Sequence, residues 1–175
     1  MQNTALKNAS DESLVERTLW GEVQAFGVLV NRYRGAVTLI AHEVLHSWTL
    51  AEDTAQEVFL VAYHSLSRLR EPERFASWLY AITRHQARKA YRKLPPQTTL
   101  DTPEIEAVTR TQYRYSNHSP EHQALQVERS QNLWKAIHRL KPEWRVVFLL
   151  RYEQEWSASQ IAAFLAIPTT TVNWR

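Results

Sequence analysis

Apolar residues recur three and four positions apart along most of this chain, and this spacing limits its fold more than any other feature. In residues 37–48 the apolar side chains follow the positions i, i+3, i+4, i+7, i+8 and i+11, which lie on one face of an α-helix. The sequence has no stretch with the alternation of a half-buried strand, and it has no glycine-containing hairpin turn. The spacing therefore predicts an all-α protein.

Two more helices are predicted after this stretch. Residues 49–52 read Thr-Leu-Ala-Glu, which is the spacing of a capping box and predicts that a helix opens at Thr49. Another helix is predicted to begin near Pro72 and to continue until the two prolines at 95 and 96 end it. Residues 119–121 read Ser-Pro-Glu, an N-cap followed by proline, which predicts a second helical block from there onward.

Residues 95–119 separate the two helical blocks. Prolines, threonines and other polar residues replace the apolar spacing there, which is typical of a linker. A chain of 175 residues is long enough for two small domains with separate cores. We therefore expect two small helical domains, at residues 10–94 and 120–175, joined by a flexible linker.

Composition excludes several classes of protein. The chain has no cysteine, which excludes disulfides, thiolate metal sites and a thiol nucleophile. Its three glycines do not form a phosphate-binding loop, which argues against nucleotide-binding folds that need one. No apolar run approaches the roughly 20 residues that cross a bilayer, and the first residues do not resemble a secretory signal. We expect a cytoplasmic protein without a cofactor, a metal or a membrane segment.

The predicted helix near Ala51 has two unlike faces when its residues are placed at about 100° intervals. The core stripe is apolar and consists of Ala51, Ala55, Val58, Phe59 and Ala62. The opposite side is polar around one leucine and consists of Asp53, Gln56, Glu57, Leu60 and His64. This side is either a solvated surface with a single exposed apolar residue or a face that docks on another protein.

The next predicted helix carries a basic stripe. Its inner side is assigned to Phe75, Trp78, Leu79, Ile82 and Gln86. The stripe roughly opposite is formed by Arg84, Arg88 and Arg92, with Tyr80 and Tyr91 along one margin and His85 along the other. Arginines bind phosphates and aromatic rings stack on unpaired bases, so the stripe favours binding of single-stranded or melting DNA. A basic helix end that complements the helix dipole is the alternative.

The C-terminal stretch has the layout of a helix-turn-helix. Residues 157–160 form a capping box, Ile161, Ala162 and Leu165 give a short apolar face, and residues 166–168 give a tight turn. Thr169 is expected to cap a second helix whose Val172 points to the core. The second helix of such a motif enters the major groove, and the residues exposed for this role are Thr169, Thr170, Thr171, Asn173, Trp174 and Arg175. A plain helical hairpin is the alternative.

Residues 42–46 read His-Glu-Val-Leu-His and match the zinc-peptidase signature H-E-x-x-H. A catalytic zinc needs a third protein ligand. No downstream motif supplies one, although His64 is available. We therefore keep a zinc metallopeptidase only as a remote alternative.

The three faces, in this order, resemble the extracytoplasmic-function (ECF) sigma factors, a group of small two-domain bacterial sigma factors. The matching strings are AEDTAQEVFLVAY at residues 51–63, FASWLYAITRHQARKAYR at 75–92 and RLKPEWRVVFLLRYEQEWSASQIAAFLAIPTTTV at 139–172. Ala25-Phe26 and Arg32-Tyr33 match as well. The resemblance covers nearly the whole chain apart from the residues before Ser10 and the linker.

The resemblance implies a role for each face. The face with Asp53, Gln56, Glu57 and Leu60 would bind core RNA polymerase. Residues 67–74 would form a pocket for a flipped base, and Trp78, Tyr80, Arg84, His85, Arg88 and Arg92 would hold the minus-ten DNA around it. The helix from Thr169 would read the minus-thirty-five element. The implied partners are core RNA polymerase, double-stranded and melted promoter DNA, and an anti-sigma factor, with no catalytic role for the chain itself.

The sequence departs from the family pattern in three respects. The family usually has glycine where Ala166 stands, and a left-handed alanine costs roughly 1–2 kcal/mol. Residues 82–85 read Ile-Thr-Arg-His, where Ile-Ala-Arg-Asn is more usual. The chain stops at Arg175, about two turns into the recognition helix, where related chains continue with a basic segment. Either the sequence is truncated here or binding to the minus-thirty-five element is impaired. A stand-alone helix-turn-helix regulator is the main alternative function.

Overall fold

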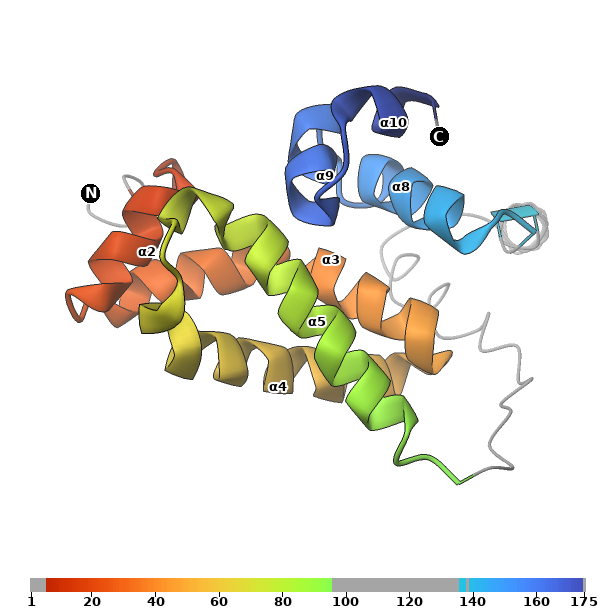
Figure 1. Cartoon of the computed structure of the whole chain (residues 1–175), viewed down its shortest axis with the longest axis horizontal. Coiled ribbons are helices and arrows are strands. Elements are labelled where there is room, and N and C mark those ends of the chain that lie inside the picture. The colour runs from red at the N-terminus through yellow and green to blue at the C-terminus, as the bar shows by residue number, and fades with distance from the viewer. Residues whose placement is uncertain (1–5, 96–135, 138, 175) are drawn as a thin grey trace, which may run out of the picture.

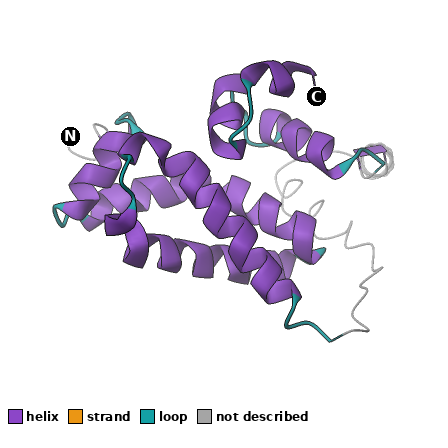
Figure 2. Cartoon of the chain, viewed as in Figure 1, coloured by secondary structure: helices purple, strands orange, loops and turns teal. Residues whose placement is uncertain are grey.

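The computed structural model describes residues 6–95, 136–137 and 139–174, and within these ranges the chain contains helices and no strand (Figure 2). The first group of helices is α2 (Asp11–Leu19), α3 (Val23–Leu45), α4 (Trp48–Ser65) and α5 (Phe75–Tyr91). Two short 3-10 helices, η1 (Leu66–Arg68) and η2 (Pro72–Arg74), join α4 to α5. The second group is α8 (Pro142–Tyr152), α9 (Ala158–Leu165) and α10 (Thr169–Trp174). The prediction of an all-α fold is confirmed.

The boundary between α3 and α4 differs from the prediction. α3 ends at Leu45, and His46 follows in the left-handed conformation with φ 52°. Ser47 then caps α4, because its side chain accepts a hydrogen bond from the Leu50 N–H. The capping box predicted at Thr49 is therefore wrong, because a serine two positions earlier already provides the cap. Trp48 belongs to α4 and not to the apolar stripe of α3.

The cores of α4 and α5 follow the predicted stripes with one shift. The five predicted core residues of α4 are all buried. In α5, Phe75 and Leu79 are fully buried, whereas Trp78, Ile82 and Gln86 are only partly buried. The buried line of α5 passes instead through small residues, namely Ala76, Thr83 and Ala87. α5 packs against α3, α4 and α9, and small side chains allow neighbouring helices to approach closely.

The helix-turn-helix is formed as the sequence predicts, with two local differences. Ser157 caps α9 in a capping box with Gln160, and Ala166 ends the helix with φ 55° and ψ 44°. Phe164 is completely buried beside the predicted apolar residues. Thr169 is the first residue of α10 and not its cap, because the Pro168 carbonyl accepts the first hydrogen bonds, from Thr171 and Val172.

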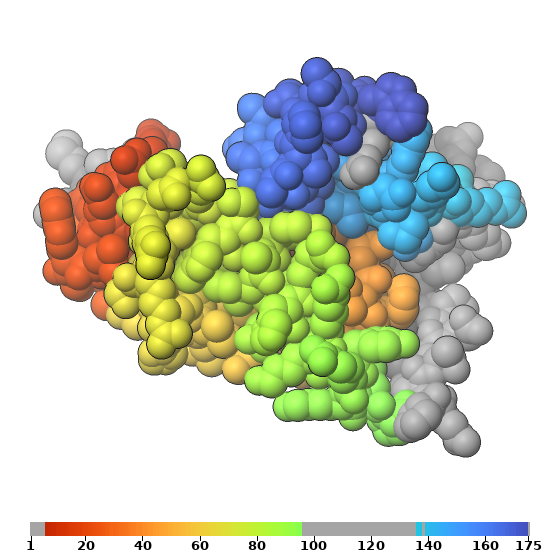
Figure 3. Space-filling model, in the orientation of Figure 1, coloured from red at the N-terminus to blue at the C-terminus, as the bar shows by residue number. Residues whose placement is uncertain are grey.

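The two groups of helices pack directly on each other. α9 lies against α5, and α8 lies against α3 (Figure 1). In the space-filling view the C-terminal helices rest on α5 and α3 (Figure 3). One buried apolar cluster includes residues of both groups, so the two domains share a buried contact and do not keep separate cores. The predicted linker and the Ser-Pro-Glu cap lie outside the described residues, apart from Pro95.

Candidate functional site

The polar face predicted on α4 is exposed. Asp53, Gln56 and Glu57 are exposed around Leu60, and 56% of Leu60 is accessible. The apolar side of α4 packs on α3 and α5, so the polar face points away from this core. An exposed leucine among two carboxylates and an amide combines a small apolar contact with negative charge, which suits a basic protein surface.

The basic stripe of α5 is also exposed. Arg84, Arg88 and Arg92 lie one helical turn apart and all three are exposed, as is His85. None of these three guanidinium groups forms an ion pair with an acid among the described residues. Three arginines about one turn apart present positive charge along about two turns of helix, which suits a phosphate backbone.

Two of the aromatic residues predicted to hold DNA are partly covered, whereas Tyr91 at the margin of the stripe is exposed. Trp78 and Tyr80 are half-buried, and Trp78 packs against Phe75 with ring centroids 6.0 Å apart. The Arg84 guanidinium lies over the Tyr80 ring, 5.7 Å from its centroid, a cation–π distance. Tyr80 also contacts Phe164 of α9, at 5.4 Å between centroids. The C-terminal domain therefore covers part of the surface predicted to hold DNA.

The segment predicted to capture a flipped base connects α4 to α5. It consists of the end of η1, a short turn and η2. Arg74 pairs with Glu71 at 2.6 Å across this segment, and both side chains are largely exposed. The pocket itself remains a prediction.

The predicted recognition helix α10 leaves most of its polar residues exposed. Thr169, Thr170, Asn173 and Trp174 are exposed, Thr171 is half-buried and Val172 is buried as predicted. Trp174 contacts Trp144 of α8 edge-on, with centroids 5.3 Å apart, while 75% of it stays accessible. Arg175 lies outside the described residues.

The zinc-like motif has structural contacts instead of a metal-site geometry. The His42 ring stacks on Trp48 with centroids 4.0 Å apart. The Glu43 carboxylate accepts two-pronged hydrogen bonds from the Arg145 guanidinium, at 2.9 Å from Nε and 2.7 Å from Nη2. In the part of the chain that the structure describes, no group of three or more His, Cys, Asp or Glu is placed to hold a metal. Glu43 is thus engaged by an arginine from the other domain.

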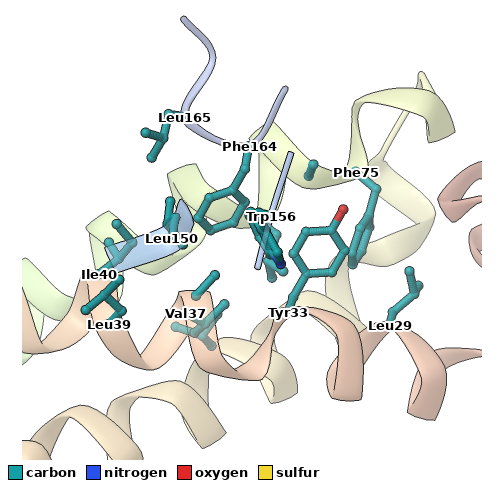
Figure 4. Close-up of a cluster of buried hydrophobic side chains, with 14 of the residues drawn as sticks. Leu29, Tyr33, Val37, Leu39, Ile40, Phe75, Leu150, Trp156, Phe164 and Leu165 are labelled. Atoms are coloured by element: carbon teal, nitrogen blue, oxygen red, sulfur yellow. The ribbon is translucent and has the colours of Figure 1, made fainter. Parts of the chain in front are cut away.

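A second polar network, which the sequence did not indicate, supports the contact between the two domains. Asp11 at the start of α2 accepts hydrogen bonds from Arg32 and from the Tyr33 hydroxyl. Burial, together with the adjacent Asp11 carboxylate, raises the pKa of Tyr33 well above its ordinary value. The Tyr33 ring stacks with Phe164 at 5.8 Å and meets Trp156 edge-on at 5.6 Å (Figure 4). Asp11 therefore fixes the position of the Tyr33 ring, which contacts Trp156 and Phe164 of the C-terminal domain.

The residues of this interdomain contact could not be identified from motifs. Glu43 and Arg145 are 102 positions apart, and nothing in either local sequence names the other as its partner. Trp156 precedes the capping serine of α9, a position where apolar residues commonly pack on the helix, which is the one signal that could have marked it as buried.

No helix in the described ranges has both the length and the apolar character needed to cross a membrane.

Two family models match the chain. Sigma-70 region 2 matches residues 29–94, which include α4 and α5. Sigma-70, region 4 matches residues 130–175, which include the helix-turn-helix. Together they span more than half of the 175 residues.

Named relatives cover almost the whole chain. The ECF RNA polymerase sigma-E factor of Escherichia coli is 31% identical over 169 residues, which are 95% of this chain and 88% of the relative. The RNA polymerase sigma-H factor of Pseudomonas aeruginosa is 29% identical over 173 residues, which are 97% of this chain and 90% of the relative. Neither alternative function, a stand-alone regulator or a zinc peptidase, gains support from these matches.

The fold is similar to that of a solved structure, CnrH in complex with the cytosolic domain of CnrY. The TM-score is 0.58 at 23% identity, over 95% of this chain and 89% of the other. At this identity the likeness shows the fold, and the family follows from the matches to regions 2 and 4 and from the sigma-E relative. The chain belongs to the sigma-70 family of RNA polymerase sigma factors and, within it, to the ECF group.

Proposed function

We propose that this sigma factor docks on core RNA polymerase through the exposed face of α4 and holds opened promoter DNA on the basic stripe of α5. Sigma factors are in general transcription initiation factors without enzymatic activity. In this proposal the chain contributes no catalytic group and gives promoter specificity to the polymerase. Its place of action is the cytoplasm, where the polymerase and the promoter are.

The observation that carries the proposal is the separation of two charged faces on adjacent helices. The acids of α4 and the arginines of α5 are exposed, while the apolar sides of both helices are buried together with α3. Charge complementarity steers association and fixes orientation. An acidic face therefore favours a basic protein surface, and an arginine stripe favours phosphates, so the two helices can bind two different partners at once.

The helix-turn-helix supplies the second DNA contact in this proposal. α10 leaves Thr170, Asn173 and Trp174 exposed at its surface, and the second helix of such a motif reads base edges in the major groove. We propose that these residues contact the minus-thirty-five element, and that Trp174 contributes an apolar contact there.

The docking face is tested by charge reversal. In the double variant Asp53→Lys, Glu57→Lys, repulsion replaces attraction to a basic surface, so we expect co-purification with core polymerase to fall by at least tenfold. Both positions are exposed, so the helical circular dichroism should be unchanged.

The matched control is Glu12→Lys, Glu16→Lys. These acids are also exposed, but they lie on α2, and their reversal changes the net charge by the same amount. If the α4 variant binds the polymerase as well as the α2 control does, α4 is not the docking face.

The sequence analysis also implied an anti-sigma factor, a protein partner that inhibits the chain. The similar structure of CnrH contains the cytosolic domain of a second protein, CnrY. We propose that a comparable protein partner regulates this chain.

A further inference from the structure

The corner between α2 and α3 exposes a group of large apolar side chains that the proposed function does not use. Trp20 is 83% accessible, Val23 60% and Leu19 46%, and we call these three residues the corner patch. Single exposed apolar residues are normal on a protein surface. Three adjacent ones that include a largely exposed tryptophan are typical of an interaction site.

The backbone of this corner is fixed, so that Trp20 has a defined place. The Glu22 N–H donates to the Arg17 carbonyl at 3.0 Å, and the Gly21 N–H donates to the Thr18 carbonyl at 2.9 Å. These are the two hydrogen bonds of a Schellman motif, and Gly21 provides the left-handed residue of the motif, with φ 97°. An ion pair of 2.7 Å between Arg17 and Glu22 closes the same turn. A tryptophan on a fixed backbone loses less freedom on binding than one on a flexible loop.

The corner patch is continuous with the exposed face of α4. Tyr63 is 40% exposed and lies about 60° around α4 from Leu60. Its ring meets Phe26 of α3 edge-on, with centroids 5.0 Å apart, and Phe26 lies one turn after Val23. In Figure 1 the end of α4 and the corner between α2 and α3 lie at the same end of the first domain. Exposed apolar side chains therefore run from Leu60 through Tyr63 to the corner patch.

The charges near the corner patch argue against DNA and against a second copy of the chain. Residues 11–31 carry four acids and one arginine, and α4 carries three acids and no lysine or arginine, although the net charge of the whole chain is +3. An acidic surface repels the phosphates of DNA. A symmetric dimer would bring the same acidic surface of two copies together. The charges therefore favour a different protein as the partner.

The corner patch is too small to hold a separate partner by itself. A buried tryptophan contributes roughly 150–250 Å², whereas a stable interface takes about 800 Å² from each partner. The patch is therefore suited to enlarge an interface that forms beside it. The neighbouring interface is the face of α4 with which the patch is continuous, and the partner of that face is core RNA polymerase.

We propose that the corner patch is a second contact with core RNA polymerase, in which Trp20 fills an apolar recess next to the surface that receives α4. This role rests on the proposed docking face of α4. Tryptophan is enriched among the residues that contribute most to binding, and such residues lie in desolvated pockets. Charges steer association, whereas apolar contacts of this kind slow dissociation. The corner patch therefore lengthens the lifetime of the complex.

Truncation of Trp20 tests this contact without DNA. Core polymerase is titrated into fluorescently labelled protein, and Trp20→Ser should raise the Kd by about tenfold or more, mainly through faster dissociation. Trp20 is largely exposed, so the thermal unfolding of this variant should match that of the parent. Trp174→Ser is the matched control, because Trp174 is a tryptophan with 75% exposure on the helix proposed to face DNA, and it should leave the Kd unchanged.

A photo-crosslink tests whether the corner touches the polymerase directly. The chain has no cysteine, so Gln24→Cys, at an exposed position next to Val23, accepts a benzophenone label and leaves the corner patch intact. We expect crosslinks to a polymerase subunit that unlabelled protein competes away and that Trp20→Ser reduces. Crosslinks to a second copy of the chain or to promoter DNA, with none to the polymerase, would overturn the proposed contact.

The α4 variant Asp53→Lys, Glu57→Lys in the same titration separates the corner patch from the docking face. If this variant binds weakly while Trp20→Ser binds as the parent does, α4 docks on the polymerase and the role of the corner patch is overturned. If Trp20→Ser weakens binding and the crosslink forms while the α4 variant binds normally, the corner contact stands and the docking role of α4 is wrong.

The α2 variant Glu12→Lys, Glu16→Lys separates apolar contact from charge. Its two positions lie one and two turns before Trp20 on α2. The variant keeps all three apolar side chains of the corner patch, and exposed charges at the rim of an interface contribute little, so it should bind nearly as well as the parent. A loss as large as that of Trp20→Ser would mean that charge acts at this corner, and the apolar contact would be refuted.

Discussion

At the scale of single residues, Tyr33 connects electrostatics to the contact between domains. Its hydroxyl donates to Asp11, and its ring carries Phe164 and Trp156 of the C-terminal domain. A tyrosine in this position must stay neutral, because ionisation would place a second negative charge beside Asp11.

The raised pKa of Tyr33 predicts a loss of stability at alkaline pH. The ordinary pKa is about 10, so above pH 10 the unfolded chain releases a proton that the folded chain still holds. The free energy of unfolding should therefore fall as pH rises above 10, by up to about 1.4 kcal/mol per pH unit from this group.

Urea unfolding between pH 8.5 and pH 11 measures this effect. Tyr33→Phe should remove this part of the decline, whereas Tyr152→Phe, at a residue with 70% exposure, should not. An equal decline in all three proteins would show that Tyr33 is not the responsible group.

Ala166 has a strained backbone conformation. It adopts φ 55° at the end of α9, a conformation that costs an L-residue roughly 1–2 kcal/mol. Ala166→Gly should therefore raise the free energy of unfolding by about 0.5–1 kcal/mol, after the greater entropy of an unfolded glycine is subtracted.

Ala163→Gly is the matched control for this substitution. Ala163 is exposed in the interior of the same helix, where glycine costs about 1 kcal/mol. The two substitutions should thus move the midpoint of unfolding in opposite directions, and a shift of the same sign would refute the strain at Ala166.

At the scale of helices, periodicity predicted the elements better than their ends. All five residues of the predicted stripe of α4 are buried, and Thr54 is buried in addition. The buried line of α5 was displaced toward Ala76, Thr83 and Ala87, and Ala87 packs with buried residues of α3 and α4. A helical wheel built on large apolar residues overlooks small residues that are buried where helices pack closely.

The arginine stripe of α5 is tested at this scale. Replacing Arg84, Arg88 and Arg92 by alanine should weaken promoter opening and reduce the salt slope of binding by about 0.7–0.9 for each phosphate contact that is lost. All three residues are exposed, so the melting temperature should change little. Open-complex formation is followed by permanganate reactivity of unpaired thymines, and an unchanged signal would contradict the assignment.

At the scale of the whole molecule, the sequence predicted two helical domains but not their contact. The matching strings at residues 51–63 and 75–92 indicated the first domain, and the helix-turn-helix indicated the second. The Glu43–Arg145 pair could not be predicted, because each residue already had a local interpretation, Glu43 as part of a zinc-like motif and Arg145 as one of many basic residues. The packing of α9 on α5 and of α8 on α3 is seen only in the structure of the whole chain.

The central claim is that this chain directs core RNA polymerase to promoters, and run-off transcription tests it most directly. Purified bacterial core polymerase is incubated with a pooled promoter library, with and without the protein, and the transcripts are sequenced. We expect discrete start sites that appear only with the protein and that are lost with Asp53→Lys, Glu57→Lys. Identical transcripts with and without the protein, at concentrations where the two co-purify, would contradict the account.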